Sequence, residues 1–466
     1  MNRWLILILI AAALLRFGYQ EAMLGFGGSF HNGSDSGKYL VIADTIFETG
    51  RFGRETGDGV QAEANRMPLY PYFVAGIFTL FGKGNLHAVV LVQILLDMAM
   101  IVGLALAALA IDRRLVVPAA ALAAIMPNFL VHASYILTET LFLFLFVWGT
   151  CACLWAIRKR QQAWLLTGAG VCFGLSLLTR PVMMYFPLFL FVTLLSVLPG
   201  RGIRDLARKA MLASIPALLI VAFAAPRMVA NYLEYGHAVL TTQSGTHLLK
   251  WVYPCLRTPW SCSSFGQAWR ENDPILKQRI QALPEAERTN PVAVDIELRK
   301  LAMERIRELG ATQIVLGMAV GAFKNLIQTG FYEVLAQFGQ PATFLSAMPG
   351  QTTSERLLNF VKTNATNVFM ILWVVSQAAL VLSRLVQLAG LGSGLVNRAT
   401  RPYALFLAMT IVYFLAINGP IANPKYRIPM EPALIIFFSI GLCALLDWYR
   451  ARRQRHPVAA AAAEAS

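Results

Sequence analysis

Asp35 and Arg66 are the side chains near the start of the chain best suited to chemistry. Both lie in a polar, Gly-rich segment, residues 31–71, that interrupts a series of hydrophobic runs. A carboxylate can accept a proton from a reacting group, and the forked guanidinium of an arginine can bind two oxygens of a phosphate. Lys38 and Tyr39 follow Asp35 closely. The segment therefore predicts a site that combines a base with an anion-binding group.

The composition places this segment in a membrane protein. Of 466 residues, 57% are apolar and 14% are charged, and the mean hydropathy is +0.57. Such values indicate a polytopic membrane protein rather than a soluble domain. The net charge of +15 would suit a nucleic acid, but the lysines and arginines stand in short clusters between hydrophobic runs. Because cytoplasmic loops carry such clusters, we predict no nucleic-acid partner.

Ten hydrophobic runs predict membrane-spanning helices. They cover residues 4–15, 86–111, 115–133, 137–157, 162–179, 181–198, 210–226, 366–388, 402–418 and 431–449. Residues 69–81 are too few to cross, since a span needs about 20 residues, and they predict a helix lying along the interface. Residues 311–348 cross twice or not at all. The predicted fold class is all-α and polytopic, with 10 to 12 transmembrane helices.

Basic clusters after alternate spans indicate which loops face the cytoplasm. The clusters at 113–114, 158–160 and 201–209 place those loops inside with the N-terminus, so the first loop lies outside. The external boundary then receives Asp35, Arg66, Glu139, Arg180, Arg227, Lys425, Tyr426 and Arg427. Charges at the hydrocarbon edge are costly unless paired or used, so each is a candidate site residue.

Each candidate also has a structural explanation. An arginine at the end of a span often extends to lipid head groups, and Asp35 before Ser-Gly suits a helix N-cap. The convergence of several candidates from distant parts of the chain favours a functional site.

Composition divides the chain into regions. They are a transmembrane module (1–230) with a catalytic first external loop (23–82), an external subdomain (231–310), a C-terminal transmembrane region (311–456) and a disordered tail (457–466). Within the subdomain, residues 285–309 predict an amphipathic helix. Cys255 and Cys262 would form a disulfide if the subdomain faces an oxidising compartment, and the sequence leaves this open.

Several short motifs resemble the integral-membrane GT-C glycosyltransferases. They are DSGKY at 35–39, RMPLYP at 66–71 with LFG at 80–82, TETLF at 138–142, GLSLLTRP at 174–181, NYLEYG at 231–236 and KYRIP at 425–429. Their order is similar to glycosyltransferase family 39, which includes bacterial relatives of the aminoarabinose lipid A transferase and the protein O-mannosyltransferases. Residues 260–360 carry no matching motif.

The resemblance implies a GT-C fold, a polyprenyl-phosphate sugar as donor, and two catalytic acids. Asp35 matches the general base, and Glu139 matches an acid that orients the sugar or the first loop. The implied substrate-binding residues are Lys38, Tyr39, Arg66, Tyr70, Arg180, Arg227, Lys425, Tyr426 and Arg427. At Arg227 the sequence departs from the family, whose arginine stands three residues later, about one helical turn away.

Together these features predict an inverting hexosyl- or pentosyltransferase on the external face of a bacterial inner membrane. It would move a sugar from a polyprenyl phosphate to lipid A, a glycan or a protein. The sequence has no P-loop, no GxGxxG after a strand, no HExxH and no His or Cys cluster with metal spacing, so we expect no metal or cofactor. Two alternatives stay open, an O-antigen ligase or polymerase-like enzyme with a diphosphate-linked donor, and a secondary transporter.

Overall fold

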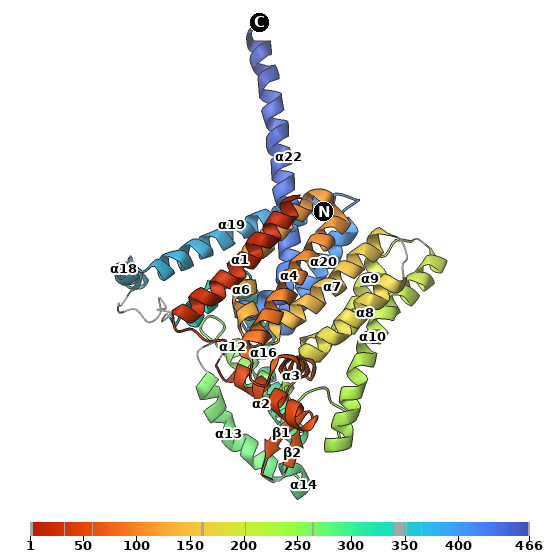
Figure 1. Ribbon diagram of the computed structural model, residues 1–466, viewed down its shortest axis with the longest axis vertical. Coiled ribbons are helices and arrows are strands. Elements are labelled where there is room, and N and C mark those ends of the chain that lie inside the picture. Colours follow the sequence, from red (N-terminus) through yellow and green to blue (C-terminus); the bar gives the residue numbers. More distant parts are fainter. Residues whose placement is uncertain are drawn as a thin grey trace.

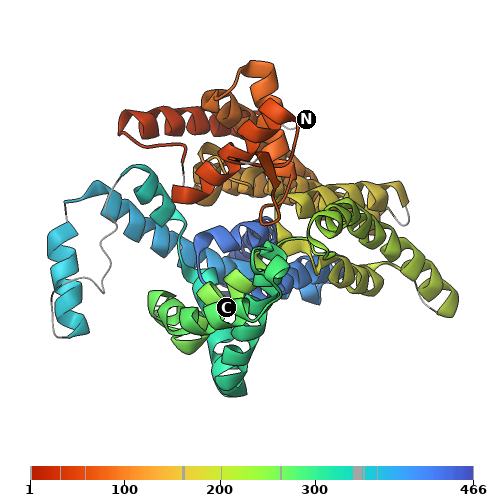
Figure 2. The same ribbon diagram turned by 90° about the horizontal axis from the view of Figure 1, so that it is seen from below.

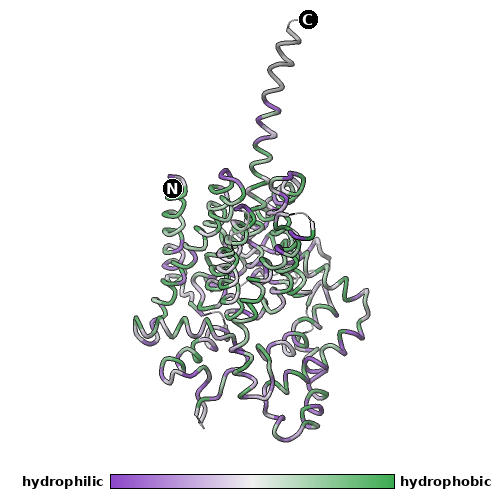
Figure 3. Tube along the Cα trace, turned by 90° about the vertical axis from the view of Figure 1, so that its right-hand side faces the viewer, coloured by the Kyte–Doolittle hydropathy of each residue, from purple (hydrophilic) through white to green (hydrophobic). Residues whose placement is uncertain are grey.

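Long helices form a bundle that carries smaller elements at one end. The computed structural model describes residues 3–31, 33–57, 59–159, 163–200, 202–262, 265–339, 349, 352–364 and 366–464. Both chain ends lie toward the same side of the bundle, and the smaller helices and a short hairpin gather on the opposite side (Figure 1). Hydrophobic residues dominate the helices of the bundle (Figure 3).

Most predicted spans are long apolar helices. In the described part of the chain, eight helices are long and apolar enough to cross a membrane, or nine if one bent pair is included. Those that coincide with predicted spans are α1 (Arg3–Gly25), α4 (Leu86–Ile111), α7 (Glu139–Arg158), α10 (Ile203–Tyr235), α19 (Val368–Val396), α20 (Arg401–Asn418) and α22 (Glu431–Glu464). The predicted all-α polytopic fold class is confirmed, but the described helices long and apolar enough to cross number eight or nine where 10 to 12 were predicted.

The bent pair replaces the span predicted at 115–133. The turn η1 (Arg113–Leu115) leads into α5 (Val116–Ile125), and α6 (Pro127–Ser134) follows at an angle of 52°. Pro127 lacks an N–H group and disfavours helical backbone at the residue before it. Met126 accordingly adopts an extended conformation, and the helix breaks there.

Two predicted spans are short helices packed against longer ones. α8 (Ala163–Thr179) lies between α7 and α10, and α9 (Phe186–Val197) packs on α10, after the turn η2 (Pro181–Met183). Glycines allow the close approach of α8 to α10, since a Cβ atom at Gly174 would lie 2.5 Å from Phe223. Small residues serve this purpose between membrane helices.

Part of the region 311–348 forms α16 (Gly310–Ile327), which lies against the external subdomain. The side chain of Gln313 donates to the carbonyl of Leu256 at 2.7 Å, and Lys324 donates to the carbonyl of Pro259 at 2.8 Å. α16 is the eighth helix long and apolar enough to cross a membrane, and both of its ends contact this one short stretch. The helices α17 (Phe331–Gln337) and α18 (Thr353–Asn364) follow, and residues 340–348 lie outside the described part.

The first external loop contains two helices and a hairpin. α2 (Gly33–Thr49) and α3 (Leu69–Phe81) flank strands β1 (Gly53–Thr56) and β2 (Gly59–Ala62). α3 coincides with the helix predicted at 69–81, whereas the hairpin was not predicted. The strands are antiparallel, and Arg54 lies opposite Gln61.

The external subdomain has its own small core. It comprises α11 (Ser244–His247), the π-helical turn η3 (Leu248–Val252), α12 (Tyr253–Arg257), α13 (Phe265–Gln281), α14 (Glu285–Arg288) and α15 (Pro291–Glu308), built around Leu249, Leu276, Leu298 and Leu301. The amphipathic helix predicted at 285–309 is two helices, because Asn290 caps α15 and Pro291 starts it. Cys255 and Cys262 form a disulfide, which settles the question that the sequence left open.

Seen from below, the N-terminal elements lie on one side and the subdomain on the other, with the dark-blue C-terminal helices between them (Figure 2). The tail differs from its prediction. Residues 457–464 continue α22, where a disordered end was expected. Alanine has the highest helix propensity of all residues, which accounts for the continuation.

Candidate functional site

Asp35 and Arg66 meet at the end of the bundle that carries the hairpin and the smaller helices (Figure 1). Asp35 lies in the first turn of α2, and Arg66 lies in the segment before α3. An Arg66 nitrogen donates to Asp35 Oδ1 at 2.8 Å, and another lies 3.4 Å from the hydroxyl of Tyr39. The guanidinium also sits 5.1 Å from the centre of the Tyr39 ring. Three of the predicted site residues thus form one contact group.

Glu139 is the centre of a second group. It begins α7 and is buried, with 1% of its side chain exposed. Its Oε1 lies 2.6 Å from Arg180 and 3.2 Å from Lys425, which belongs to α21 (Pro424–Arg427). A buried carboxylate needs such partners, because removing an ion from water costs several kcal/mol unless it is paired.

Lys425 joins the two groups. Its Nζ lies 4.0 Å from Asp35 Oδ2, and Lys38 approaches Asp35 from the other side at 3.8 Å. We call this set the ion cluster; its members are Asp35, Lys38, Arg66, Glu139, Arg180 and Lys425. Its four cations and two carboxylates give a formal net charge of +2.

The two acids of the ion cluster have different surroundings. Asp35 has 39% of its side chain exposed, whereas Glu139 has 1%. Asp35 lies inside the first turn of α2, so its side chain is not the N-cap that the structural explanation required. An incoming molecule can therefore reach Asp35, while Glu139 is confined to holding Arg180 and Lys425.

Arg66 is held in its charged form. Burial alone would lower the pKa of Arg66, but Tyr39 and Asp35 raise it above its ordinary value. Glu63 orients the backbone beside it, because its Oε1 accepts the N–H groups of Asn65 at 2.7 Å and Arg66 at 3.0 Å.

Three other predicted substrate-binding residues form no ion pair with the ion cluster. Tyr70 is fully buried, and its hydroxyl donates to Gln93 at 2.7 Å. Burial raises the pKa of Tyr70 well above its ordinary value, and the ring supports Tyr39 from 5.3 Å. Tyr426 is half-buried, 6.5 Å from the ring of His247.

Arg427 is the third, and its placement differs most from the prediction. Its side chain is 1% exposed and pairs with Glu431 at 2.5 Å, and it donates to the carbonyl of Asn325 at 2.9 Å. The helical turn of α21 points Lys425 to the ion cluster and Arg427 into the protein interior. This guanidinium is fully engaged by the protein, so a substrate role does not fit it.

Arg227 lies near the ion cluster but does not belong to it. It donates to the carbonyls of Glu63 and Arg66, so it lies behind the backbone that carries Arg66. It also borders an apolar cavity of about 540 Å³. The other lining residues are Phe52, Pro68, Tyr72, Leu178, Ala222, Phe223, Pro226 and Ala230.

Sequence reasoning missed several residues beside the site. Glu63 lies in the same polar loop as Arg66, but nothing in the sequence separates it from other surface acids. His132 is buried, and its Nε2 lacks a hydrogen-bond partner. Glu333 is buried in α17 and interacts with Lys425 and Asn423. Among the described residues, no group of three or more His, Cys, Asp or Glu is placed to hold a metal ion.

The chain has the GT-C fold, as the sequence resemblance implied. Residues 65–227 match the family model described as dolichyl-phosphate-mannose-protein mannosyltransferase. No curated protein sequence matches significantly.

Two solved oligosaccharyltransferase structures support the fold assignment. The oligosaccharyltransferase AglB from Archaeoglobus fulgidus, in complex with an inhibitory peptide and a dolichol-phosphate, has a TM-score of 0.51 and 16% identity over 97% of this chain and 52% of its own. The apo form of the same enzyme also has a TM-score of 0.51, with 15% identity over 98% of this chain and 52% of its own. The chain thus spans about half the length of these oligosaccharyltransferases. ArnT from Cupriavidus metallidurans bound to undecaprenyl phosphate has a TM-score of 0.38 and 17% identity over 94% of this chain and 78% of its own.

Proposed function

We propose that the chain is a membrane glycosyltransferase that moves a sugar from a polyprenyl-phosphate donor to an acceptor hydroxyl or amine. The observation that carries this proposal is the ion cluster, in which an accessible carboxylate lies beside several cations. A reaction of this kind needs a base for the acceptor and positive charge for the departing phosphate.

The charge of the ion cluster suits such a donor. A sugar linked to a polyprenyl phosphate carries one negative charge, and the released lipid phosphate carries up to two. The formal net charge of +2 on the ion cluster therefore best matches the charge of the released lipid phosphate. Groups aimed at charge that develops during the reaction lower its barrier.

The proposed step is a single displacement with inversion. The acceptor oxygen or nitrogen attacks the anomeric carbon, the bond from that carbon to the phosphate oxygen breaks, and the lipid phosphate leaves with the electron pair. The acceptor proton passes to Asp35. Donor phosphate would compete with Asp35 for Arg66, whose nitrogen is now 2.8 Å from the carboxylate. This competition frees the carboxylate for the proton.

Glu139 acts as a positioning residue in this proposal. It is buried between Arg180 and Lys425, so it has no open face toward a substrate. Its charge holds both cations close to Asp35, where the phosphate would lie.

The apolar cavity beside Arg227 supports a lipid-linked donor. Its lining is almost entirely hydrophobic, and it reaches Pro68, two residues after Arg66. An isoprenoid chain in this cavity would place its phosphate near the external boundary. In this arrangement Arg227 does not contact the phosphate directly. It stabilises the backbone of Arg66 by donating to its carbonyl.

The external face is the proposed side of the reaction. The ion cluster lies at the end of the bundle that carries the disulfide subdomain, and basic residues 158–159 lie at the other end of α7. Disulfides persist in oxidising compartments such as the bacterial periplasm. We therefore place the protein in a bacterial inner membrane with its site outside.

The direct test is transfer from defined donors. Purified protein would be incubated with labelled polyprenyl-phosphate sugars, labelled polyprenyl-diphosphate sugars and an envelope extract containing lipid A, glycans and proteins. We expect label to move from the monophosphate donor only. Movement from the diphosphate donor alone would favour a ligase or polymerase, and uptake of label into vesicles without transfer would favour a transporter.

A further inference from the structure

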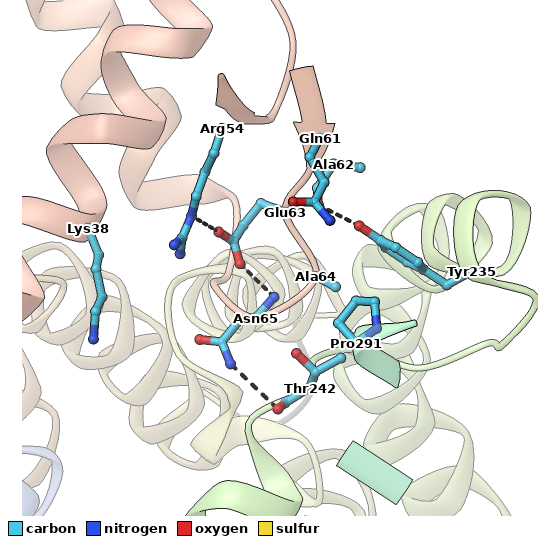
Figure 4. A pocket seen from close by; sticks show the side chains of 10 residues that line it. All are labelled: Lys38, Arg54, Gln61, Ala62, Glu63, Ala64, Asn65, Tyr235, Thr242 and Pro291. Carbon is cyan, nitrogen blue, oxygen red and sulfur yellow. Dashed lines mark hydrogen bonds and ion pairs between the residues drawn. The ribbon is translucent and has the colours of Figure 1, made fainter. Parts of the chain in front are cut away.

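A second cavity lies beside the ion cluster, between the hairpin of the first external loop and the external subdomain (Figure 4). Its volume is about 320 Å³, at the lower end of the range for small-molecule sites. The polar residues that line it are Lys38, Arg54, Gln61, Glu63, Asn65 and Thr242.

The cavity is continuous with the ion cluster through shared residues. Lys38 lines the cavity, and its Nζ lies 3.8 Å from Asp35 Oδ1. Asn65 lines it as well and directly precedes Arg66. A molecule held in the cavity would therefore lie next to the proposed base.

A buried charge organises one wall of the cavity. Glu63 is 5% exposed, and its carboxylate accepts Arg54 Nε at 2.6 Å together with the backbone N–H groups of Asn65 and Arg66. Figure 4 shows the Arg54 guanidinium and the Asn65 side chain on either side of Glu63. This wall is preorganised, since each of its bonds holds the loop in one conformation.

The opposite wall comes from the subdomain. The N–H group of Thr242 donates to the carbonyl of Ala64 at 3.1 Å, and the hydroxyl of Thr241 donates to the carbonyl of Asn65 at 2.6 Å. The hydroxyl of Tyr235 donates to the carbonyl of Ala62 (Figure 4). The cavity exists only when the subdomain docks on the first loop, which gives the subdomain a role in selecting what binds there.

The chemistry of the lining indicates the ligand. Lys38 and Arg54 carry positive charge, and Glu63 is the one carboxylate that opposes them among the described lining residues. Glu63 is already engaged by Arg54 Nε, so terminal guanidinium nitrogens of Arg54 and the amide of Gln61 remain for a ligand. The rest of the lining is Ala62, Ala64, Pro291 and the ring of Tyr235, which together are too small a surface for an acyl chain.

We propose that this cavity binds the acceptor, and that the acceptor is an acidic saccharide whose carboxylate or phosphate pairs with Arg54 and Lys38. This inference rests on the proposed function, because only a transferase has an acceptor. The saccharide can bind in the cavity without any transfer reaction. A sugar hydroxyl next to the anionic group would then face Asp35.

The hairpin offers variants with a matched control. Arg54 and Gln61 are cross-strand partners and share one face, while Glu55 and Val60 share the other face. Arg54→Gln removes the charge, Arg54→Lys retains it, and Gln61→Glu adds a repelling charge. Glu55→Gln is the control, since it changes a charge on the face that points away from the cavity.

Binding would be measured on the purified full chain by saturation-transfer NMR with three probes. They are tri-galacturonate, neutral maltotriose, and a peptide containing Ser and Thr. We expect tri-galacturonate to bind, and we expect Arg54→Gln and Gln61→Glu to weaken its binding by about tenfold or more, because each removes or opposes a charge-assisted contact. Arg54→Lys should retain most of the affinity, and Glu55→Gln should bind like the unchanged protein.

Several results would overturn the proposal. They are equal binding of maltotriose and tri-galacturonate, preferential binding of the peptide, and unchanged affinity in both Arg54→Gln and Gln61→Glu. Misfolding is excluded as the cause of lost binding in Arg54→Gln if its unfolding midpoint in detergent matches that of Arg54→Lys, which keeps a cation beside Glu63. Binding of undecaprenyl phosphate, measured separately on the same variants, tests the proposed function: its absence alongside normal tri-galacturonate binding would reject the transferase and leave the saccharide site standing.

Discussion

Lys425 places its Nζ 3.2 Å from Glu139 Oε1, although the two residues come from opposite halves of the chain. The same nitrogen lies 4.0 Å from Asp35. One ammonium group therefore connects the first external loop with the start of α7. Much of the proposed mechanism depends on this connection, because it sets an accessible base and a phosphate-binding cation side by side.

Removal of the Lys425 charge should slow transfer. We expect Lys425→Met to reduce the initial rate with a labelled polyprenyl-phosphate sugar by about 100-fold, the usual effect of losing one group that stabilises developing charge. Lys425→Arg should recover part of the rate. Lys83→Met is the control, since Lys83 pairs with Glu48 away from the ion cluster. A full rate in Lys425→Met would remove Lys425 from phosphate binding.

Glu139 should matter for stability as well as activity. Glu139→Gln leaves Arg180 and Lys425 without their buried counter-ion, and breaking a buried pair in this way costs about 3–5 kcal/mol. We expect a clearly lower midpoint of thermal unfolding in detergent. The double variant Glu139→Gln with Arg180→Gln should lose less than the sum of the two single losses, because the second change removes the unpaired charge. Strictly additive losses would contradict the coupling.

Glu333 predicts a pH dependence of stability. Burial raises the pKa of Glu333 above its ordinary value of 4.5, although Lys425 opposes the change. The folded protein thus holds this proton more tightly than the unfolded chain. The resulting stability is fully present below pH 4.5 and is lost as the pH rises through the raised pKa.

Glu333→Gln cannot ionise, so it should raise the unfolding midpoint relative to the unchanged protein at neutral pH. The advantage should shrink toward about pH 4, where Glu333 is protonated in both states. Thermal unfolding of the two proteins across this range checks the prediction, with the exposed Glu55→Gln as control. A constant difference at every pH would show that the effect comes from packing rather than from ionisation.

The membrane sides can be tested with reporters. A phosphatase that is active only outside the cytoplasm should be inactive when fused after Lys159 and active when fused after Gln281. The first position ends a span with a basic cluster, and the second lies in the disulfide subdomain. An active fusion after Lys159 would overturn the assignment of the external face.

The sequence allowed much of the site to be predicted. Charge clusters placed Asp35, Glu139 and Lys425 on one side of the membrane, and in the structure they meet. Charge counting can group such residues because the positive-inside rule acts on loops independently of how the helices pack. The same reasoning could not separate Lys425 from Arg427, since only the turn of α21 determines which of them points inward.

Other features were hidden from sequence patterns. Each strand of the hairpin has four residues, too few for a clear alternation of polar and apolar side chains. The break at Met126 depends on one proline inside a long apolar run, which was interpreted as a straight span. Glu63 acts through the N–H groups of Asn65 and Arg66, and such bonds leave no trace in residue spacing.

The most direct test of the account is the rate of transfer by Asp35→Asn compared with Asp44→Asn. Both residues lie on α2, but Asp44 is outside the ion cluster, and the two proteins should unfold at similar temperatures. We predict that Asp35→Asn reduces transfer from a labelled polyprenyl-phosphate sugar by about 100-fold or more, as expected for loss of a general base, and that Asp44→Asn retains the full rate. Full activity in Asp35→Asn would contradict the assignment of Asp35 as the base.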